Sequence, residues 1–280
     1  MESASLPAGS ARPEPRSPAS KPTRRPGPLD ELGELVQFTG AVFRALPGSL
    51  RYYSEAMRIN ALITRRTSVL MFMMAAFLGA SASNFGFFLL RSLGASDFVG
   101  IIPGILVPRQ LGPQMFGYVF AGSVCCAIAA ELGSAKVQQE VDALESEGVD
   151  PMQMLVGSRV IACLLYVPLA AMLVISGGLA GAFLIIVVVL QGNTSQQFID
   201  GVFSVFPSIQ MVYVTVTVAA IAIQCVIVAC FYGMRTGGGP DAVGNAVARS
   251  LGVNLVLLHV VLSLVSLVFY GGGLGLPIGD

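Results

Sequence analysis

The chain alternates long uncharged apolar stretches with short polar connections. The stretch from Thr67 to Leu90 is 24 residues without a charged side chain. As an α-helix it spans about 36 Å, which exceeds the ~30 Å of membrane hydrocarbon. Four further apolar stretches follow. The pattern therefore predicts an all-α membrane protein with about five transmembrane helices, over residues 67–90, 110–130, 160–190, 209–233 and 250–270.

Two parts of this pattern are irregular. Residues 92–109 contain several glycines and prolines, too many for a free-standing span, and we expect a short re-entrant or surface helix there. The stretch 160–190 is longer than one span needs. Pro168 and the glycines between 177 and 181 allow it to kink or to extend beyond the bilayer.

Three segments flank the spans. Residues 1–28 are rich in Pro, Ser, Ala and Arg and are predicted to form a disordered tail. Residues 29–66 begin with apolar positions at helical spacing and continue with mixed aromatic and basic residues, which favours an amphipathic helix in the membrane interface. Packing of that helix on the bundle is the alternative. Residues 271–280 form a Gly-rich tail.

Charge placement predicts the orientation. Lys and Arg beside membrane spans are retained on the cytoplasmic side. A cytoplasmic amino terminus and an external carboxyl terminus put 14 of the 16 basic residues inside, leaving Arg91 and Arg109 outside. We expect a multi-pass protein of the plasma membrane. A chain that is 54% hydrophobic and 11% charged is not a water-soluble domain, and its zero net charge gives no attraction for nucleic acid.

The connection between the second and third spans is strongly acidic. On a helix over residues 134–148, Val137, Val141 and Leu144 form a narrow apolar stripe with acids on both sides, and Gly148 and Pro151 supply the stop. One apolar ridge with a charged rim is typical of a docking helix for a cytoplasmic partner. A solvated linker is the alternative.

The connection between the fourth and fifth spans turns at a glycine run. Gly237, Gly238 and Gly239 precede Pro240, and a helix is expected to restart at Asp241. The phosphate-loop motif Gly-x-x-x-x-Gly-Lys-Ser/Thr is absent from the sequence, so we expect no nucleotide bound by this chain.

Polar residues inside the apolar stretches have two interpretations. Asn84, Gln224, Asn254 and His259 could line a headgroup path, but such residues more often bond neighbouring helices. The stretches contain no pair of acids of the kind that couples proton or sodium flow. The five cysteines lie in apolar runs without metal-ligand spacing, so we expect packing thiols and no metal site.

Two motifs carry a family resemblance. Phe120 to Pro151, including Ala-Glu-Leu-Gly-Ser-Ala-Lys-Val-Gln-Gln-Glu, resembles the signature of the MlaE/YrbE permeases. The run Gly-Gly-Gly-Pro-Asp-Ala-Val-Gly-Asn-Ala-Val, with Gly237–Pro240 and Gly244, is similar to their second cytoplasmic motif. The likeness extends over residues 29–270, with a permease domain at 67–270. It is nearest to the YrbE permeases of actinobacterial Mce systems, in particular the A-type.

This resemblance implies a subunit of an ABC transporter that moves lipids. Its partners would be a second YrbE-type permease, an MceG/MlaF-like ATPase dimer that uses ATP and Mg, and Mce-domain proteins. The chain itself would be non-catalytic, and its acidic helix would be the coupling helix. The residues that match this coupling motif are Glu131, Lys136, Glu140, Asp142, Glu145, Glu147 and Asp150. Fatty acids, sterols and phospholipids all suit such a path. A scaffolding membrane subunit without its own lipid path is the alternative.

One position departs from the family pattern. Where the family often carries Ala-Gly-Arg-x-Gly, this chain has Ala-Gly-Ser-Val-Cys with Ser123 in place of the arginine. A basic group near the membrane centre is thereby removed, and lipid handling is expected to be more purely apolar. Ser123 joins Asn84, Asn254 and His259 as a candidate for the lipid path.

Overall fold

The computed structural model describes residues 28–95, 98–207 and 209–271, and this part of the chain is helical without any β-strand. Five helical stretches in it are long and apolar enough to cross a membrane, as predicted. The predicted tails lie outside the described residues except for Pro28 and Gly271. The elements are α1 Pro28–Ser49, η1 Leu50–Tyr52, α2 Tyr53–Ser92, α3 Ile101–Leu106, η3 Val107–Leu111, α4 Gly112–Phe120, η4 Ala121–Cys125, α5 Cys126–Val137, α6 Glu140–Ser146, η5 Met152–Gly157, α7 Ser158–Phe183, η6 Leu184–Val189, α8 Ser195–Ser204, α9 Ile209–Met234 and α10 Pro240–Tyr270.

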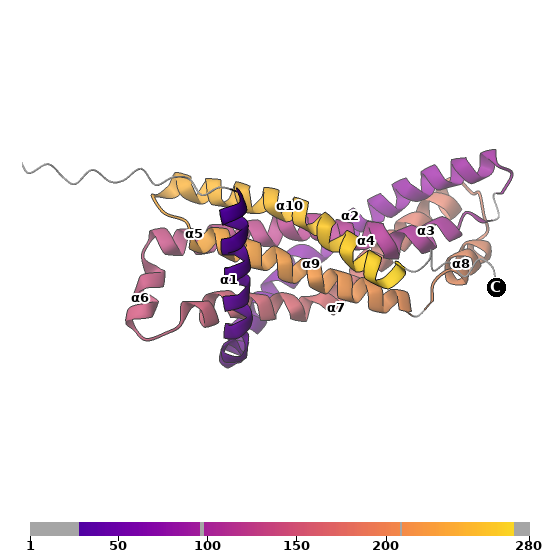
Figure 1. The fold of residues 1–280 in the computed structure, drawn as a ribbon. Coiled ribbons are helices and arrows are strands. Elements are labelled where there is room, and N and C mark those ends of the chain that lie inside the picture. Colours follow the sequence, from indigo (N-terminus) through magenta and orange to yellow (C-terminus); the bar gives the residue numbers. More distant parts are fainter. Residues whose placement is uncertain (1–27, 96–97, 208, 272–280) are drawn as a thin grey trace, which may run out of the picture.

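The long helices share one direction, and α1 lies across them near one end of the bundle (Figure 1). That end also holds α6 and the start of α10, and is called the α6 end below. The opposite end holds α3 and α8 and is called the α8 end. A helix that crosses a transmembrane bundle has the orientation that an interfacial helix needs.

Helix α1 packs on the bundle, which was the alternative foreseen for the amphipathic segment, and it also has an exposed apolar face. One face is tied to the end of α9, where the Tyr232 hydroxyl donates to Glu31 Oε1 at 2.8 Å and Arg235 forms an ion pair with Glu34. The other face carries exposed apolar side chains, namely Leu32, Val36 and Phe43. The helix therefore packs on the bundle while it presents an apolar surface outward.

Helix α2 starts earlier than the predicted first span. It begins at Tyr53, so residues 53–66 of the predicted interfacial region form its first turns. Arg65 and Arg66 were the signal for the boundary at 67, but a pair of arginines does not interrupt a helix. With 40 residues α2 is about 60 Å long, roughly twice the thickness of membrane hydrocarbon.

The helix of the second span also starts earlier than expected. It runs from Ile101 to Val137, so residues 101–109 continue into it and form no separate surface helix. Pro103, Pro108 and Pro113 lie within it, and it contains the π-helical segments η3 and η4. Pro103 lies in the first turn, where a proline is tolerated. In membrane helices local π-type adjustments such as η3 pair the backbone groups that a proline leaves free, so that Pro108 and Pro113 do not end the helix.

Glycines bring α2 and α7 into backbone contact. A Cβ atom at Gly79 would lie 2.0 Å from the carbonyl oxygen of Gly178, and one at Gly181 would lie 1.9 Å from that of Ala76. At Gly177 the nearest atom would be the Phe72 carbonyl oxygen at 2.6 Å. Small residues at a helix contact allow this approach and its dispersion attraction in a membrane. We call this contact the glycine seam.

The centre of the bundle is packed with apolar side chains and thiols. Cys125, Cys163, Cys225 and Cys230 are free and buried, and Cys126 is half-buried, in agreement with packing cysteines. The described residues contain no group of three or more His, Cys, Asp or Glu side chains that could hold a metal ion.

Candidate functional site

The acidic connection leaves the bundle through a sharp turn at the α6 end. Helix α5 ends at Val137, and Gln139 adopts a left-handed conformation with φ of 61° before α6 begins at Glu140. Residues 134–148 therefore form the last turn of α5, a turn and the short α6, which differs from the single helix predicted over this range. The sequence shows no glycine at the turn, so nothing in it marks the break.

The apolar stripe of α6 points inward. Val141 is 1% exposed and Leu144 is half-buried, so the ridge predicted to dock on a partner packs within this chain. The acids of the helix and of its carboxyl end are exposed, namely Glu140, Asp142, Glu145 and Glu147. Lys136 Nζ lies 2.6 Å from Asp142 Oδ1 and ties α6 to α5. What α6 offers a partner is a negatively charged face.

The return from α6 has the stop that the sequence predicts. Gly148 is left-handed with φ of 79°, and Pro151 precedes η5. The exposed Asp150 accepts a hydrogen bond at Oδ1 from the Met152 backbone N–H, at 2.9 Å. Asp150 thus starts the helix that leads into α7, and α6 is joined to α5 on one side and to α7 on the other.

The second predicted motif lies at the same end. Gly238 and Gly239 are left-handed, with φ of 97° and 111°, and Pro240 is the first residue of α10. Because α10 starts there, its helix begins ten residues before the predicted span. A Cβ atom at Gly133 of α5 would lie 3.1 Å from Thr236 Oγ1, so the glycine turn packs on α5 just before α6. Gly237 and Gly244 have open space around them.

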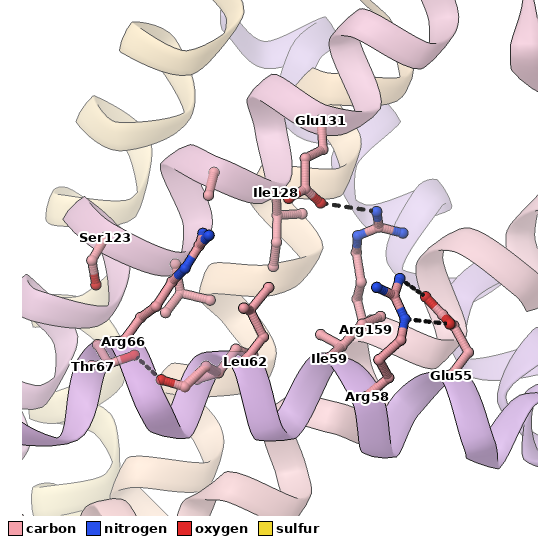
Figure 2. A pocket seen from close by; sticks show the side chains of 13 residues that line it. Glu55, Arg58, Ile59, Leu62, Arg66, Thr67, Ser123, Ile128, Glu131 and Arg159 are labelled. Carbon is pink, nitrogen blue, oxygen red and sulfur yellow. Dashed lines mark hydrogen bonds and ion pairs between the residues drawn. The ribbon is translucent and has the colours of Figure 1, made fainter.

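A groove of about 290 Å³ lies between α2 and α5, next to the start of α7 (Figure 2). Its polar lining comprises Glu55, Arg58, Arg66 and Thr67 from α2, Ser123 from η4, Glu131 from α5 and Arg159 from α7. Its apolar lining includes Ile59, Leu62, Ile63, Val124 and Ile128. A concave surface with apolar walls and a few charged groups is the usual form of a site for an amphiphile.

Two ion pairs stand at this groove. Arg58 is bidentate to Glu55, with Nη2 2.6 Å from Oε1 and Nε 2.9 Å from Oε2. Arg159 Nη2 lies 3.3 Å from Glu131 Oε2 and links α7 to α5. Glu131, predicted to couple to the ATPase, thus lies at the groove and not on α6.

Sequence reasoning missed the arginines as site residues. Arg58 and Arg66 are eight residues apart, with Glu55 and Leu62 at spacings of three and four, which places all of them on one helix face. That spacing was the available signal. Arg159 could not be found this way, because it comes from a helix distant in sequence.

The four candidates for the lipid path are not brought together. Ser123 lines the groove, whereas Asn84 is half-buried on α2 and does not line it. Asn254 is fully buried, accepts from Gln224 Nε2 at 2.8 Å and donates to the Cys225 carbonyl at 3.3 Å. Asn254 and Gln224 therefore bond neighbouring helices.

His259 also joins helices. Its Nδ1 lies 2.7 Å from the Leu255 carbonyl, and because a carbonyl only accepts, Nδ1 carries the proton. Nε2 then accepts from the Tyr118 hydroxyl at 2.9 Å, which ties α10 to α4. The imidazole is exposed on the outside of the chain and is not part of the groove.

Comparison with known proteins identifies the family. The sequence matches the family model described as Permease MlaE over residues 57–268, which is more than half of the chain. The chain belongs to the MlaE permease family. The match includes the α5 wall of the groove, the α2 wall from Met57 onward, α6 and the glycine turn before α10.

Curated relatives agree with this assignment. The chain is similar to a probable ABC transporter permease protein of Rickettsia typhi, with 28% identity over 59% of this chain and 64% of the relative. A probable ABC transporter permease protein of Synechocystis is 30% identical over 60% of this chain and 63% of the relative. The chloroplastic protein Trigalactosyldiacylglycerol 1 of Arabidopsis thaliana is 26% identical over 64% of this chain and 51% of its own length. The chain thus spans under two thirds of the length of these relatives.

Proposed function

We propose that this MlaE-family chain is the transmembrane subunit of an ABC transporter that moves lipids, with ATP and Mg used by a separate ATPase dimer. The names of the bacterial relatives support the transporter class, and the Arabidopsis relative is named after a lipid. The observation that carries the coupling role is α6. It presents four exposed acids at the end of the bundle, while Val141 is buried and Leu144 is half-buried.

In this proposal the α6 end is cytoplasmic. Support comes from the basic side chains of the described residues. Nine lie on α1, η1, the first four turns of α2, the end of α5, the start of α7, just beyond α9 or in the first turns of α10, which are the parts of the chain at the α6 end. The other two are Arg91 at the end of α2 and Arg109 in η3. The nine are Arg44, Arg51, Arg58, Arg65, Arg66, Lys136, Arg159, Arg235 and Arg249. The carboxyl terminus is then external, and the protein resides in the plasma membrane.

The connections of α6 suggest how ATP hydrolysis reaches the lipid. One end of α6 continues from α5, which forms one wall of the groove. The other end leads through η5 into α7, which the glycine seam fixes to α2, the opposite wall. A partner that moves α6 therefore acts on both walls, and the Glu131–Arg159 ion pair lies where they meet.

Charge reversal on α6 tests the coupling. Glu140→Lys with Glu145→Lys leaves two acids and two lysines on the exposed face of α6 and so cancels its net negative charge, whereas Asp200→Lys on α8 changes an exposed acid at the other end. We expect the α6 variant to lose co-purification of the ATPase or at least tenfold of its lipid-stimulated ATP hydrolysis, and the α8 variant to keep both. Unchanged assembly and hydrolysis in the α6 variant would refute the coupling role.

The complete transporter in this proposal contains a second YrbE-type permease and Mce-domain proteins that carry the lipid onward. Exposed apolar side chains on α2 and α10 support contact with lipid or with the second permease, for example Phe77, Phe85, Val256 and Leu264. A scaffold without its own path is the competing function. A photoactive lipid should label Leu62 in the groove more strongly than the bulk-exposed Val268 if the chain handles lipid, and equally if it is a scaffold.

A further inference from the structure

The groove between α2 and α5 holds one positive charge that is not balanced. Of its three arginines, Arg58 is paired with Glu55 and Arg159 with Glu131. Arg66 has no ion-pair partner within the described part of the chain. Two acids against three guanidinium groups leave a single net positive charge.

Arg66 reaches across the groove from α2. Figure 2 shows its guanidinium extending toward the α5 wall, between Ser123 and Ile128. Ser123 is uncharged, and its hydroxyl donates a hydrogen bond to the Val119 carbonyl of the same helix. The expectation of a purely apolar path, drawn from the serine at this position, therefore overlooked a cation that comes from the opposite wall.

The Arg66 guanidinium is exposed next to the first residue of the predicted span, at the level where basic side chains attract anionic lipid headgroups. Arginine is suited to bind phosphate or carboxylate oxygens through two parallel hydrogen bonds. Next to Arg66 lie Leu62, Ile63 and Val124, which offer a surface for an acyl chain. A groove of about 290 Å³ is at the lower limit for a small-molecule site, so it holds a headgroup and the beginning of a chain.

We propose that this groove binds a lipid with a monoanionic headgroup and that Arg66 selects that charge. The inference rests on the proposed lipid-transport function and adds the headgroup class to it. One uncompensated cation matches one negative charge. A zwitterionic lipid would bring its own cation into a groove that already has a positive excess.

The absence of tryptophan from the sequence allows a direct measurement of binding. Leu62→Trp, at a position 42% exposed, places a single fluorophore in the groove, and Phe77→Trp, at a position 71% exposed, places one on the outer face of α2. The full-length chain is reconstituted into phosphatidylcholine vesicles containing dibrominated phosphatidylglycerol or dibrominated phosphatidylcholine. One membrane-facing basic residue contributes about fivefold to anionic-lipid binding, so we expect about fivefold preferential quenching by phosphatidylglycerol at position 62 and little preference at position 77.

Charge variants then identify the residue responsible. In the Leu62→Trp background, Arg66→Gln should abolish the preference, and Arg65→Gln, a change to the neighbouring arginine that does not line the groove, should keep it. Arg66→Gln combined with Ser123→Arg moves the guanidinium to the other wall and should restore the preference. Equal quenching by both lipids, or a preference that survives Arg66→Gln, would overturn the proposal, and so would a double variant that fails to regain it.

A second measurement separates this inference from the transport function. Native mass spectrometry of the chain without introduced tryptophan should show about fivefold less phosphatidylglycerol retained by Arg66→Gln than by Arg65→Gln. Equal retention would overturn the role of Arg66. If lipid-stimulated ATP hydrolysis by the complex persists alongside that result, the transport function stands and the headgroup assignment alone fails.

Discussion

Adding one methyl group to the glycine seam should weaken the bundle. In Gly181→Ala the new Cβ would lie 1.9 Å from the Ala76 carbonyl oxygen, whereas ordinary contacts begin near 3.4 Å. Helices α2 and α7 must separate by roughly 1.5 Å at this point. Relaxation is limited because Gly79 and Gly177 make further close backbone contacts along the same seam, at 2.0 and 2.6 Å from the Cβ positions.

The size of the effect follows from two opposing terms. Overpacking costs about 1–3 kcal/mol. Replacing glycine by alanine inside a helix recovers about 0.5–1 kcal/mol of conformational free energy. With the middle of each range the net loss is about 1.25 kcal/mol, and at about 2–4 °C per kcal/mol for a domain of 150–250 residues the melting temperature should fall by about 2.5–5 °C.

The buried thiols provide the assay. Because Cys163, Cys225 and Cys230 become reactive only when the bundle opens, a thiol-reactive dye reports unfolding of the purified chain in detergent. Gly40→Ala is the matched control, since a Cβ atom at that position of α1 would meet no atom within 4 Å. It should leave the melting temperature unchanged or raise it slightly. A Gly181→Ala variant that melts at or above the wild-type temperature would refute the reasoning.

Three further predictions concern single contacts. Asn254→Ala leaves Gln224 without its buried partner and should lower the unfolding free energy by about 1–2 kcal/mol, as measured by thermal unfolding. The double variant Asn254→Ala with Gln224→Leu should lose less unfolding free energy than the two single variants added together. Gln139→Val should weaken ATPase assembly because a β-branched residue resists the left-handed conformation there, whereas Gln139→Gly should preserve it. Glu34→Lys places like charges beside Arg235 and should raise hydrogen exchange in residues 30–49 but not in α7; equal exchange would exclude a role of this pair in holding α1.

Hydropathy was sufficient to predict the five spans, because uncharged stretches of this length have few other structures. The first and last residues of the helices were harder to predict from the sequence. Pro103 and Pro108 indicated a break, but Pro103 lies in the first turn of α3, where a proline costs no helical hydrogen bond, and Pro108 lies in the π-helical segment η3. The turn at Gln139 has no local signal, since glutamine seldom adopts a positive φ, and it divides the predicted docking helix.

The candidate site, too, could be predicted from the sequence only in part. The acidic face of α6 was readable from residue spacing, but the direction of its apolar ridge depended on which surface Val141 would meet. The groove could not be predicted, because Arg66 and Ser123 are 57 positions apart and face each other through the packing of three helices. Sequence patterns describe each helix face, whereas a site between helices depends on how those faces are paired.

The glycine seam also determines which parts of the chain can move. Helices whose backbones touch along several turns move together, so we expect α2 and α7 to move as one rigid unit. The other wall of the groove, α5, is joined to α7 directly by the Arg159–Glu131 pair and, beyond the turn at Gln139, through α6. Widening the groove therefore requires α5 to move away from α2 and α7 together. The ion pair between Arg159 and Glu131 must break before α5 can do so.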